Sequence, residues 1–294
     1  MTAYRCSVAS GERTEPLFAT ASRVDRWLVV EQRGPWSGET VPRSRLGDAL
    51  AGSLRRLAGR AGARLLLVRR PGGVPATGRR VFFADSRPGS EQLLARVVQD
   101  EELPDLTLPG SDPAHWSPPG GRLLLVCTHG RHDPCCALWG RPVARALAAR
   151  YPQETWECTH SGGDRFAPNL VVLPEGYYFG RMSPAEAPGI VASLDEGRLA
   201  TAYLRGRSSL DLPVQAAQHF ARERLEADIA TDLAPLDHRQ AADDTWRVAL
   251  RSTDFGEVAV TVRRVPQPAH RLTCSALAPS EAVGFGLVDL FASG

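Results

Sequence analysis

The most informative stretch of this chain leads from an apolar segment into a group of cysteines and histidines: Leu123-Leu-Leu-Val-Cys127-Thr-His129-Gly-Arg-His132-Asp133-Pro-Cys135-Cys136. The four apolar residues predict a buried strand that ends at Cys127. Residues 141–150 predict a helix with Pro142 near its first turn, a position that tolerates proline. Residues 155–159 predict a second strand, followed by His160-Ser-Gly-Gly-Asp164. Polar, chemically reactive side chains therefore follow both strands.

Further along the chain, residues 170–173 and 177–181 predict a hairpin around the turn Pro174-Glu-Gly176. Ser183 is expected to cap a helix that has Pro184 at its first position and runs toward Leu194. The order is β-α-β-β-α. With a cysteine at the end of the first strand, this order suits a thioredoxin-like layer, a small mixed sheet flanked by helices.

The N-terminal half shows the same order of elements. Strands are expected over 27–31, 64–68 and 80–84, with helices over 42–61 and 90–98, the second capped by Ser90. Five prolines between residues 103 and 121 indicate a linker. We therefore predict an α/β (α+β) protein with two thioredoxin-like β-α-β-β-α units in tandem, over 1–103 without a cluster and over 122–207 with the metal site.

Residues 208–294 are expected to form a small C-terminal α+β appendage. A helix is expected over 212–225, and strands over 246–251, 257–265 and 271–276. The last of these strands contains Cys274, which we expect to be a buried small apolar residue, as we do Cys6.

Composition narrows the functional classes. The chain of 294 residues is 43% hydrophobic and 23% charged, and its net charge of +2 gives no argument for nucleic acid or an anionic membrane as partner. No apolar run approaches the ~18–20 residues of a membrane span, and residues 1–20 lack the layout of a signal peptide. We expect a cytoplasmic protein, whose thiols stay reduced. The chain has no lysine, which excludes Schiff-base chemistry and a Walker A site.

Four of the six cysteines and three of the seven histidines lie between residues 127 and 160. Thiolate and imidazole are ligands of iron–sulfur clusters and zinc. Eight residues separate Cys127 from Cys136, which is too long a loop for the zinc knuckles and ribbons that favour two to four. Both strands can end at one edge of the sheet, so four ligands from these segments can converge on a bulkier centre.

These residues resemble the sucrase/ferredoxin-like family, relatives of the thioredoxin-like 2Fe–2S ferredoxins. The family pattern Cys-x-His-x-x-(Arg)-Asp-x-x-Cys, His-x-Gly-Gly-x-x-Phe-Ala-x-Asn and Tyr-Gly-Arg is matched by Cys127, His129, Asp133, Cys136, His160, Gly162, Gly163, Phe166, Ala167, Asn169 and Phe179-Gly180-Arg181. The match covers about residues 122–182 and extends more weakly to residues 27–36.

The resemblance implies a 2Fe–2S cluster held by Cys127, Cys136 and His160, because relatives use two cysteines and two histidines. Asp164 stands where the family has its second histidine. The fourth ligand therefore stays open between Asp164, Cys135 and Cys158, and we favour Asp164 because its spacing from His160 is retained. His129 and His132, the latter at a position where the family often has arginine, are expected to be hydrogen-bonding groups of the loop.

The resulting hypothesis is an electron-transfer or redox-sensing protein with one 2Fe–2S cluster and a redox partner protein. Alternatives are a thiol oxidoreductase using Cys135 and Cys136 at a helix N-terminus, and a structural zinc protein using Cys127, Cys136 and His160. Sucrose hydrolysis, suggested by the family name alone, is disfavoured because no recognisable pair of carboxylates forms an acid and a nucleophile.

Overall fold

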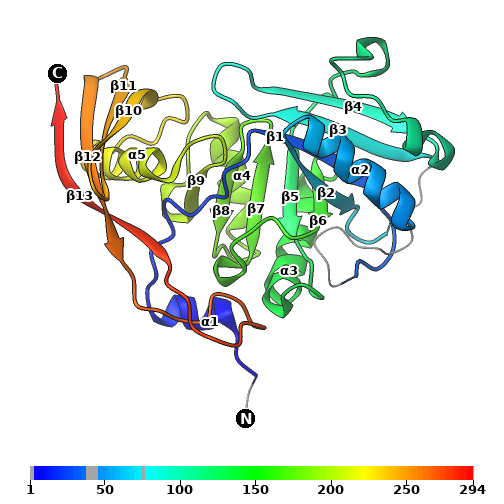
Figure 1. Cartoon of the computed structure of the whole chain (residues 1–294), viewed down its shortest axis with the longest axis horizontal. Coiled ribbons are helices and arrows are strands. Elements are labelled where there is room, and N and C mark those ends of the chain that lie inside the picture. Colours follow the sequence, from blue (N-terminus) through cyan, green and yellow to red (C-terminus); the bar gives the residue numbers. More distant parts are fainter. Residues whose placement is uncertain (1–2, 38–45, 74–76, 294) are drawn as a thin grey trace.

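Nine strands form one mixed sheet at the centre of the molecule, in the order β4-β3-β1-β2-β6-β5-β7-β8-β9 (Figure 1). The computed structural model describes residues 3–37, 46–73 and 77–293. The strands are β1 (Arg26–Glu31), β2 (Ala63–Arg69), β3 (Arg79–Asp85), β4 (Gln92–Val98), β5 (Leu123–Cys127), β6 (Thr155–Cys158), β7 (Asn169–Leu173), β8 (Tyr177–Gly180) and β9 (Leu204–Arg207). The α/β class predicted from the sequence is confirmed.

The sheet contains the same strand arrangement twice. In the order β2-β1-β3-β4, β1 is parallel to β2 and antiparallel to β3, which is antiparallel to β4. In the order β6-β5-β7-β8, the same pairs have the same senses. An antiparallel pairing of β2 with β6 joins the two groups into one continuous sheet. The arrangement as two thioredoxin-like units, and their boundaries at 1–103, 122–207 and 208–294, stay predictions.

One predicted helix in the N-terminal half is wrong. Residues 92–98 form β4, which pairs with β3 along its whole length, whereas a helix capped by Ser90 was expected. The apolar residues Leu93, Leu94, Val97 and Val98 fit a helical spacing as well as a strand. The free edge of β3 decides the outcome, because its backbone groups need partners. The predicted helix over 42–61 is observed as α2 (Asp48–Arg60), and residues 42–45 lie outside the described residues.

The helices that follow β1, β5 and β8 cover one face of the sheet. They are α2, α3 (Pro134–Arg150) and α4 (Ala187–Asp195). Leu124 and Val126 of β5 share a buried core with residues of α3 and α4. The alternate residues Leu125 and Cys127 belong to the core of the other face, as the period of two in a strand requires.

On the other face, the sheet curls so that side chains from strands that are not neighbours touch. Phe82 of β3 meets Trp156 of β6 edge to face with ring centroids 5.5 Å apart, although β1 and β2 lie between these strands in the sheet. Trp27 and Tyr178, from the two strand groups, lie 6.3 Å apart. Both groups therefore share one hydrophobic core.

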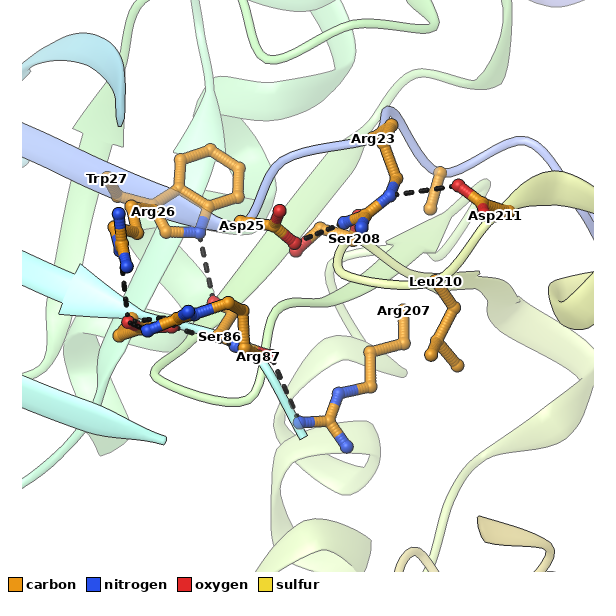
Figure 2. Close-up of polar contacts among 12 residues, drawn as sticks. Arg23, Asp25, Arg26, Trp27, Ser86, Arg87, Arg207, Ser208, Leu210 and Asp211 are labelled. Atoms are coloured by element: carbon orange, nitrogen blue, oxygen red, sulfur yellow. Dashed lines mark hydrogen bonds and ion pairs between the residues drawn. The ribbon is translucent and has the colours of Figure 1, made fainter. Parts of the chain in front are cut away.

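Polar contacts also join the two strand groups near the start of β1 (Figure 2). The indole of Trp27 donates to the Ser86 hydroxyl at 3.0 Å, and that hydroxyl donates to the carbonyl of Pro174 at 2.6 Å. The guanidinium of Arg207 donates to the Ser86 carbonyl at 3.1 Å. Ser86 thus links the end of β3 to the β7–β8 turn and to β9.

The C-terminal segment forms a second sheet, seen at one end of the molecule in Figure 1. The predicted helix is α5 (Leu212–Leu225), and the predicted strands at 246–251 and 257–265 are β11 (Thr245–Ser252) and β12 (Gly256–Pro266). β10 (Ala234–Ala242) and β13 (Val283–Ala292) were not predicted. The strand predicted over 271–276 is wrong, because these residues form bends and turns.

Shorter elements complete the fold. They are the helix α1 (Cys6–Glu12) and the 3-10 helices η1 (Asp100–Asp105), η2 (Pro113–His115), η3 (Asp164–Phe166) and η4 (Thr201–Tyr203). In Figure 1, α1 lies beside the segment between β12 and β13, so residues near the two ends of the chain meet. Among the described residues, no helix combines the length and apolar character needed to cross a bilayer.

Candidate metal centre

The two cysteine-bearing strand ends lie side by side. β5 and β6 are parallel, and Cys127 is the register partner of Cys158. The carboxyl ends of parallel neighbours share one edge of a sheet. The prediction that both strand ends open on the same edge is therefore confirmed, and the residues after each strand are brought together.

The helix between these strands begins earlier than predicted. α3 starts at Pro134, not at Arg141, and Pro142 lies inside it. Asp133 caps the helix, because its side chain accepts from the backbone N–H of Cys135 at 2.8 Å. Aspartate before a first-turn proline is a strong helix start, which the sequence analysis missed in favour of the second proline. Cys135 and Cys136 consequently lie in the first turn of α3.

The four predicted ligands form a closed ring of neighbours, which we call the strand-end site. The Cys136 thiol donates to Oδ1 of Asp164 at 3.1 Å. Nδ1 of His160 lies 2.9 Å from the same oxygen. Cys136 and His160 both act on the pKa of the Cys127 thiol, so Cys127 is a neighbour of both. A cysteine at a strand end, one on a helix and two residues after the next strand thus meet at one point.

Two further histidines extend the strand-end site. The ring centroids of His132 and His160 lie 3.8 Å apart with the rings tilted by 33°, and Nε2 of His132 lies 3.6 Å from Oδ2 of Asp164. His132, His160 and Asp164 offer ligand atoms close enough to hold one metal ion. His129 is buried and bonds the carbonyl of Ser37 at 2.6 Å, a structural role that agrees with the sequence expectation.

Neighbouring groups in the strand-end site shift the pKa values of its side chains. Burial alone would lower the pKa of His160, but hydrogen bonds to Asp164 and Cys127 outweigh it and raise the pKa to about 9. Burial would raise the pKa of Asp164, yet hydrogen bonds from His132 and His160 lower it to about 2. Hydrogen bonds from Cys136 and Cys158 lower the pKa of the Cys127 thiol well below its ordinary value. Asp164 and Cys127 are thus held as carboxylate and thiolate. The hydrogen bond with Cys127 and burial raise the pKa of the Cys136 thiol well above its ordinary value, so Cys136 and His160 must each lose a proton before they bind a metal.

Arg205 and Asn169 contact the glycine turn that follows His160 and hold it in place. Gly163 has a φ of +82°, and a Cβ there would collide with the guanidinium of Arg205. Asn169, the only asparagine of the chain, donates to the Gly163 carbonyl at 2.9 Å and accepts from Arg205 at 2.7 Å. Positive φ and this close approach explain the glycine. Approach of the turn to a cluster stays a prediction.

The four remaining cysteines lie in two separate places. Cys158 is fully buried and is the register partner of Cys127, so it lies beside the strand-end site. Cys135 points away from that site and meets Cys274, with the two sulfur atoms 3.4 Å apart. Cys274 also lies 3.6 Å from the sulfur of Cys6. Cys6 is fully buried, as expected, and Cys274 is only partly buried; the contact between their thiols was not predicted.

The strand-end site fits an iron–sulfur cluster. It combines two thiols, an imidazole and a carboxylate at the meeting point of three segments. Thiolate and imidazole are the donors that hold iron–sulfur clusters. Cys136 and His160 both lie against the same oxygen of Asp164, so these donors face one another.

Comparisons with known proteins agree with the motif. A family model described as Sucrase/ferredoxin-like matches residues 17–206, which confirms the resemblance. "Altered inheritance of mitochondria protein 32" from Eremothecium gossypii is 31% identical over 143 residues, 43% of this chain and 44% of that protein. The chain thus matches less than half of that relative's length.

Solved structures were also compared. Two Cys-to-Ser variants of the thioredoxin-like 2Fe–2S ferredoxin from Aquifex aeolicus are 21% identical, with a TM-score of 0.25 over 29% of this chain and 97% of theirs. A TM-score this low does not establish a shared fold.

Proposed function

Since this chain belongs to the sucrase/ferredoxin-like family, we propose that it is an electron-transfer or redox-sensing protein that binds one 2Fe–2S cluster in the strand-end site. The observation that carries the proposal is the closed ring of contacts among Cys127, Cys136, His160 and Asp164. Cysteine and histidine are the donors of iron–sulfur centres with mixed ligation, and Asp164 stands in the place of a second histidine. A redox partner protein is part of the proposal.

Cys127, Cys136 and Asp164 would hold the cluster from the buried side, and His160 from the solvent-exposed side. Both cysteines are at most 1% exposed, so they exclude water from the sulfur side. The side chains of His160 and His132 are 22% and 27% exposed. The two histidines thus form the solvent-exposed side of the site, where we expect a redox partner to approach.

A bound cluster would supply one-electron transfer. Replacing thiolate by neutral imidazole raises the potential, from about −400 mV in plant-type ferredoxins to roughly −150 to +300 mV in Rieske centres. Here one imidazole and one carboxylate replace two thiolates, so we expect a potential between these classes. His160 can hold a proton beside Asp164, which would couple the potential to pH.

The test is the visible spectrum of protein purified without oxygen. A ferric 2Fe–2S centre is red-brown, whereas zinc and thiol forms are colourless. We expect Cys127→Ser and Cys136→Ser each to abolish the colour, because thiolate is the main iron ligand. Cys274→Ser is the matched control and should keep it, since Cys274 contacts Cys6 and Cys135 rather than the strand-end site.

Two results would contradict the proposal. A colourless protein with zinc bound through Cys127 and Cys136 would favour the structural zinc alternative. A full spectrum in either of the two serine variants would show that the ligands are misassigned. The hydrogen bond with Cys6 lowers the pKa of Cys135 to about 5, as the thiol oxidoreductase alternative requires, but the thiols of Cys135 and Cys136 face Cys274 and Asp164 respectively and not each other.

A further inference from the structure

A second group of metal-binding side chains lies on the other side of the α3 N-terminus. It consists of Cys6, Cys135, Cys274 and Asp133, and we call it the three-cysteine group. The three cysteine sulfur atoms and one carboxylate oxygen of Asp133 all lie within 4.8 Å of one another. The members come from α1, from the start of α3 and from the segment between β12 and β13.

The spacings match a single tetrahedral ion. Sulfur atoms of Cys135 and Cys274 are 3.4 Å apart, and those of Cys274 and Cys6 are 3.6 Å apart. Four ligands around zinc, with Zn–S near 2.3 Å and Zn–O near 2.0 Å, place two sulfurs about 3.8 Å apart and a sulfur and an oxygen about 3.5 Å apart. Oδ2 of Asp133 lies 3.5 Å from the sulfur of Cys6. The sulfurs are too far apart for disulfides, whose S–S length is about 2.05 Å.

The protein around the three-cysteine group holds its donors in place. Cys6, Cys135 and Asp133 are fully buried, and Cys274 is half-buried, which leaves an entry path. Oδ2 of Asp133 accepts from the backbone N–H of Cys274 at 2.7 Å, and its Oδ1 accepts from that of Cys135. A carboxylate oxygen with an accepted hydrogen bond keeps a second lone pair, and hydrogen-bonded ligands are typical of metal sites.

The segments that carry these residues are tied together independently of the thiols. The Tyr4 hydroxyl donates to the Arg271 carbonyl at 2.8 Å, and the Arg271 guanidinium lies 4.3 Å above the Tyr4 ring. The same guanidinium donates to the Cys274 carbonyl at 2.8 Å. These contacts hold the segments that carry Cys6 and Cys274 against each other without using the thiols.

We propose that Cys6, Cys135, Cys274 and Asp133 bind one Zn²⁺ ion, separate from the strand-end site. Binding forms three Zn–S bonds and one Zn–O bond and releases the three thiol protons to solvent. The ion would fasten both ends of the chain to the first turn of α3. Soft thiolate donors and a closed, four-ligand arrangement are the features of a structural zinc site.

Metal analysis of the full-length protein tests this proposal. We expect about one zinc per chain in addition to any iron. Cys6→Ser and Cys274→Ser should each lower zinc at least fivefold and keep the visible spectrum of the strand-end site. Cys127→Ser is the reciprocal control and should keep zinc, so failure of the cluster proposal and failure of the zinc proposal give different results.

A second measurement distinguishes loss of the metal site from misfolding of the variants. Zinc-free wild type titrated with Co²⁺ should develop a thiolate-to-cobalt absorption at one equivalent. Cys274→Ser should lose this band, and Cys274→His, which restores a zinc ligand, should regain a tetrahedral cobalt spectrum. Unchanged zinc in Cys6→Ser and Cys274→Ser would overturn the proposal. So would a disulfide among the three cysteines, found by mass spectrometry of protein kept under native, unreduced conditions.

Discussion

The carboxylate of Asp164 faces three groups that can each carry a proton. Oδ1 accepts from the Cys136 thiol and lies near His160, and Oδ2 lies near His132. Its side chain is only 2% exposed. A buried carboxylate so surrounded stays ionised, as its lowered pKa of about 2 indicates. Asp164 is thus an anionic donor placed where the family pattern has a histidine.

Replacing Asp164 tests whether this donor binds iron. A carboxylate exchanges with water more easily than imidazole, so we expect Asp164→His to lengthen the lifetime of the cluster in air. Its potential should also vary more steeply with pH, toward about 59 mV per unit for each proton taken up with the electron. Asp164→Ala should shorten the lifetime. Bleaching kinetics and spectroelectrochemistry measure both effects.

The control for these variants is Asp254→Ala, an exposed aspartate in the turn between β11 and β12, which should leave the lifetime unchanged. An unaffected Asp164→Ala variant together with a bleached Cys158→Ser variant would identify Cys158 as the fourth ligand. The centre would then have three cysteines and one histidine, and a lower potential than we expect. Cys135 no longer competes for this role, because it faces Cys274.

Among the elements, the short junction between β2 and β6 joins the two strand groups. Only Val68 with Cys158 and Arg69 with Glu157 are register partners there. Thr159 extends the junction, because its N–H donates to the Leu67 carbonyl at 2.9 Å and its hydroxyl accepts from the Leu67 N–H at 3.0 Å. A side chain thus takes the place of a missing backbone pair directly before His160.

Thr159→Val should weaken this junction. Valine fills the same space but leaves the buried Leu67 N–H without its acceptor, which costs about 1–3 kcal/mol. Chemical denaturation measures the free energy of unfolding. Thr261→Val in the separate C-terminal sheet is the matched control and should change it by less than about 0.5 kcal/mol. Equal effects of the two variants would show that the hydroxyl of Thr159 does not stabilise the junction.

On the scale of the whole molecule, Glu15 links segments that are far apart in the chain. Its carboxylate accepts from the Ser10 hydroxyl at 2.7 Å and from Arg165 at 2.6 Å, and lies 3.2 Å from His270. Burial would raise the pKa of Glu15, but the hydrogen bond from Ser10 and the charge of Arg165 outweigh it and lower the pKa. Glu15 thus holds the N-terminal segment against η3 and the C-terminal loop.

The lowered pKa predicts how stability depends on pH. A carboxyl group whose pKa falls on folding stabilises the folded state above its ordinary pKa of 4.5, and this stabilisation is lost as the pH falls through the folded value. Glu15→Gln should therefore lower the free energy of unfolding by about 1.5–3 kcal/mol at neutral pH. The difference from wild type should shrink below pH 4.5.

Denaturation series at several pH values measure this difference. Glu12→Gln, an exposed residue of α1, is the control and should show little effect at any pH. A loss in Glu15→Gln that stays constant down to pH 3 would mean that packing, and not the charge of Glu15, links these segments.

The sequence alone predicted most strands of the central sheet and the residues that meet in the strand-end site. Apolar runs bounded by turn residues predicted β1, β2, β3, β5, β6, β7 and β8, because a buried strand needs few signals beyond its own side chains. The spacing of Cys127, Cys136, His160 and Asp164 predicted a meeting point because strand, helix and strand fold back within one βαβ segment. The start of α3 was also readable from Asp133 and Pro134, and was missed.

Tertiary structure decided what depends on distant partners. β4 is a strand because the edge of β3 was free to pair with it, and the two strand groups share one sheet because β2 pairs with β6. Cys6 and Cys274 meet across 268 residues of chain, a contact that no local pattern encodes. Local periodicity records which face of an element is buried, but not which remote segment covers it. Only the tertiary structure brings Cys6 and Cys274 to Cys135 in the first turn of α3, because their segments are far apart in the sequence.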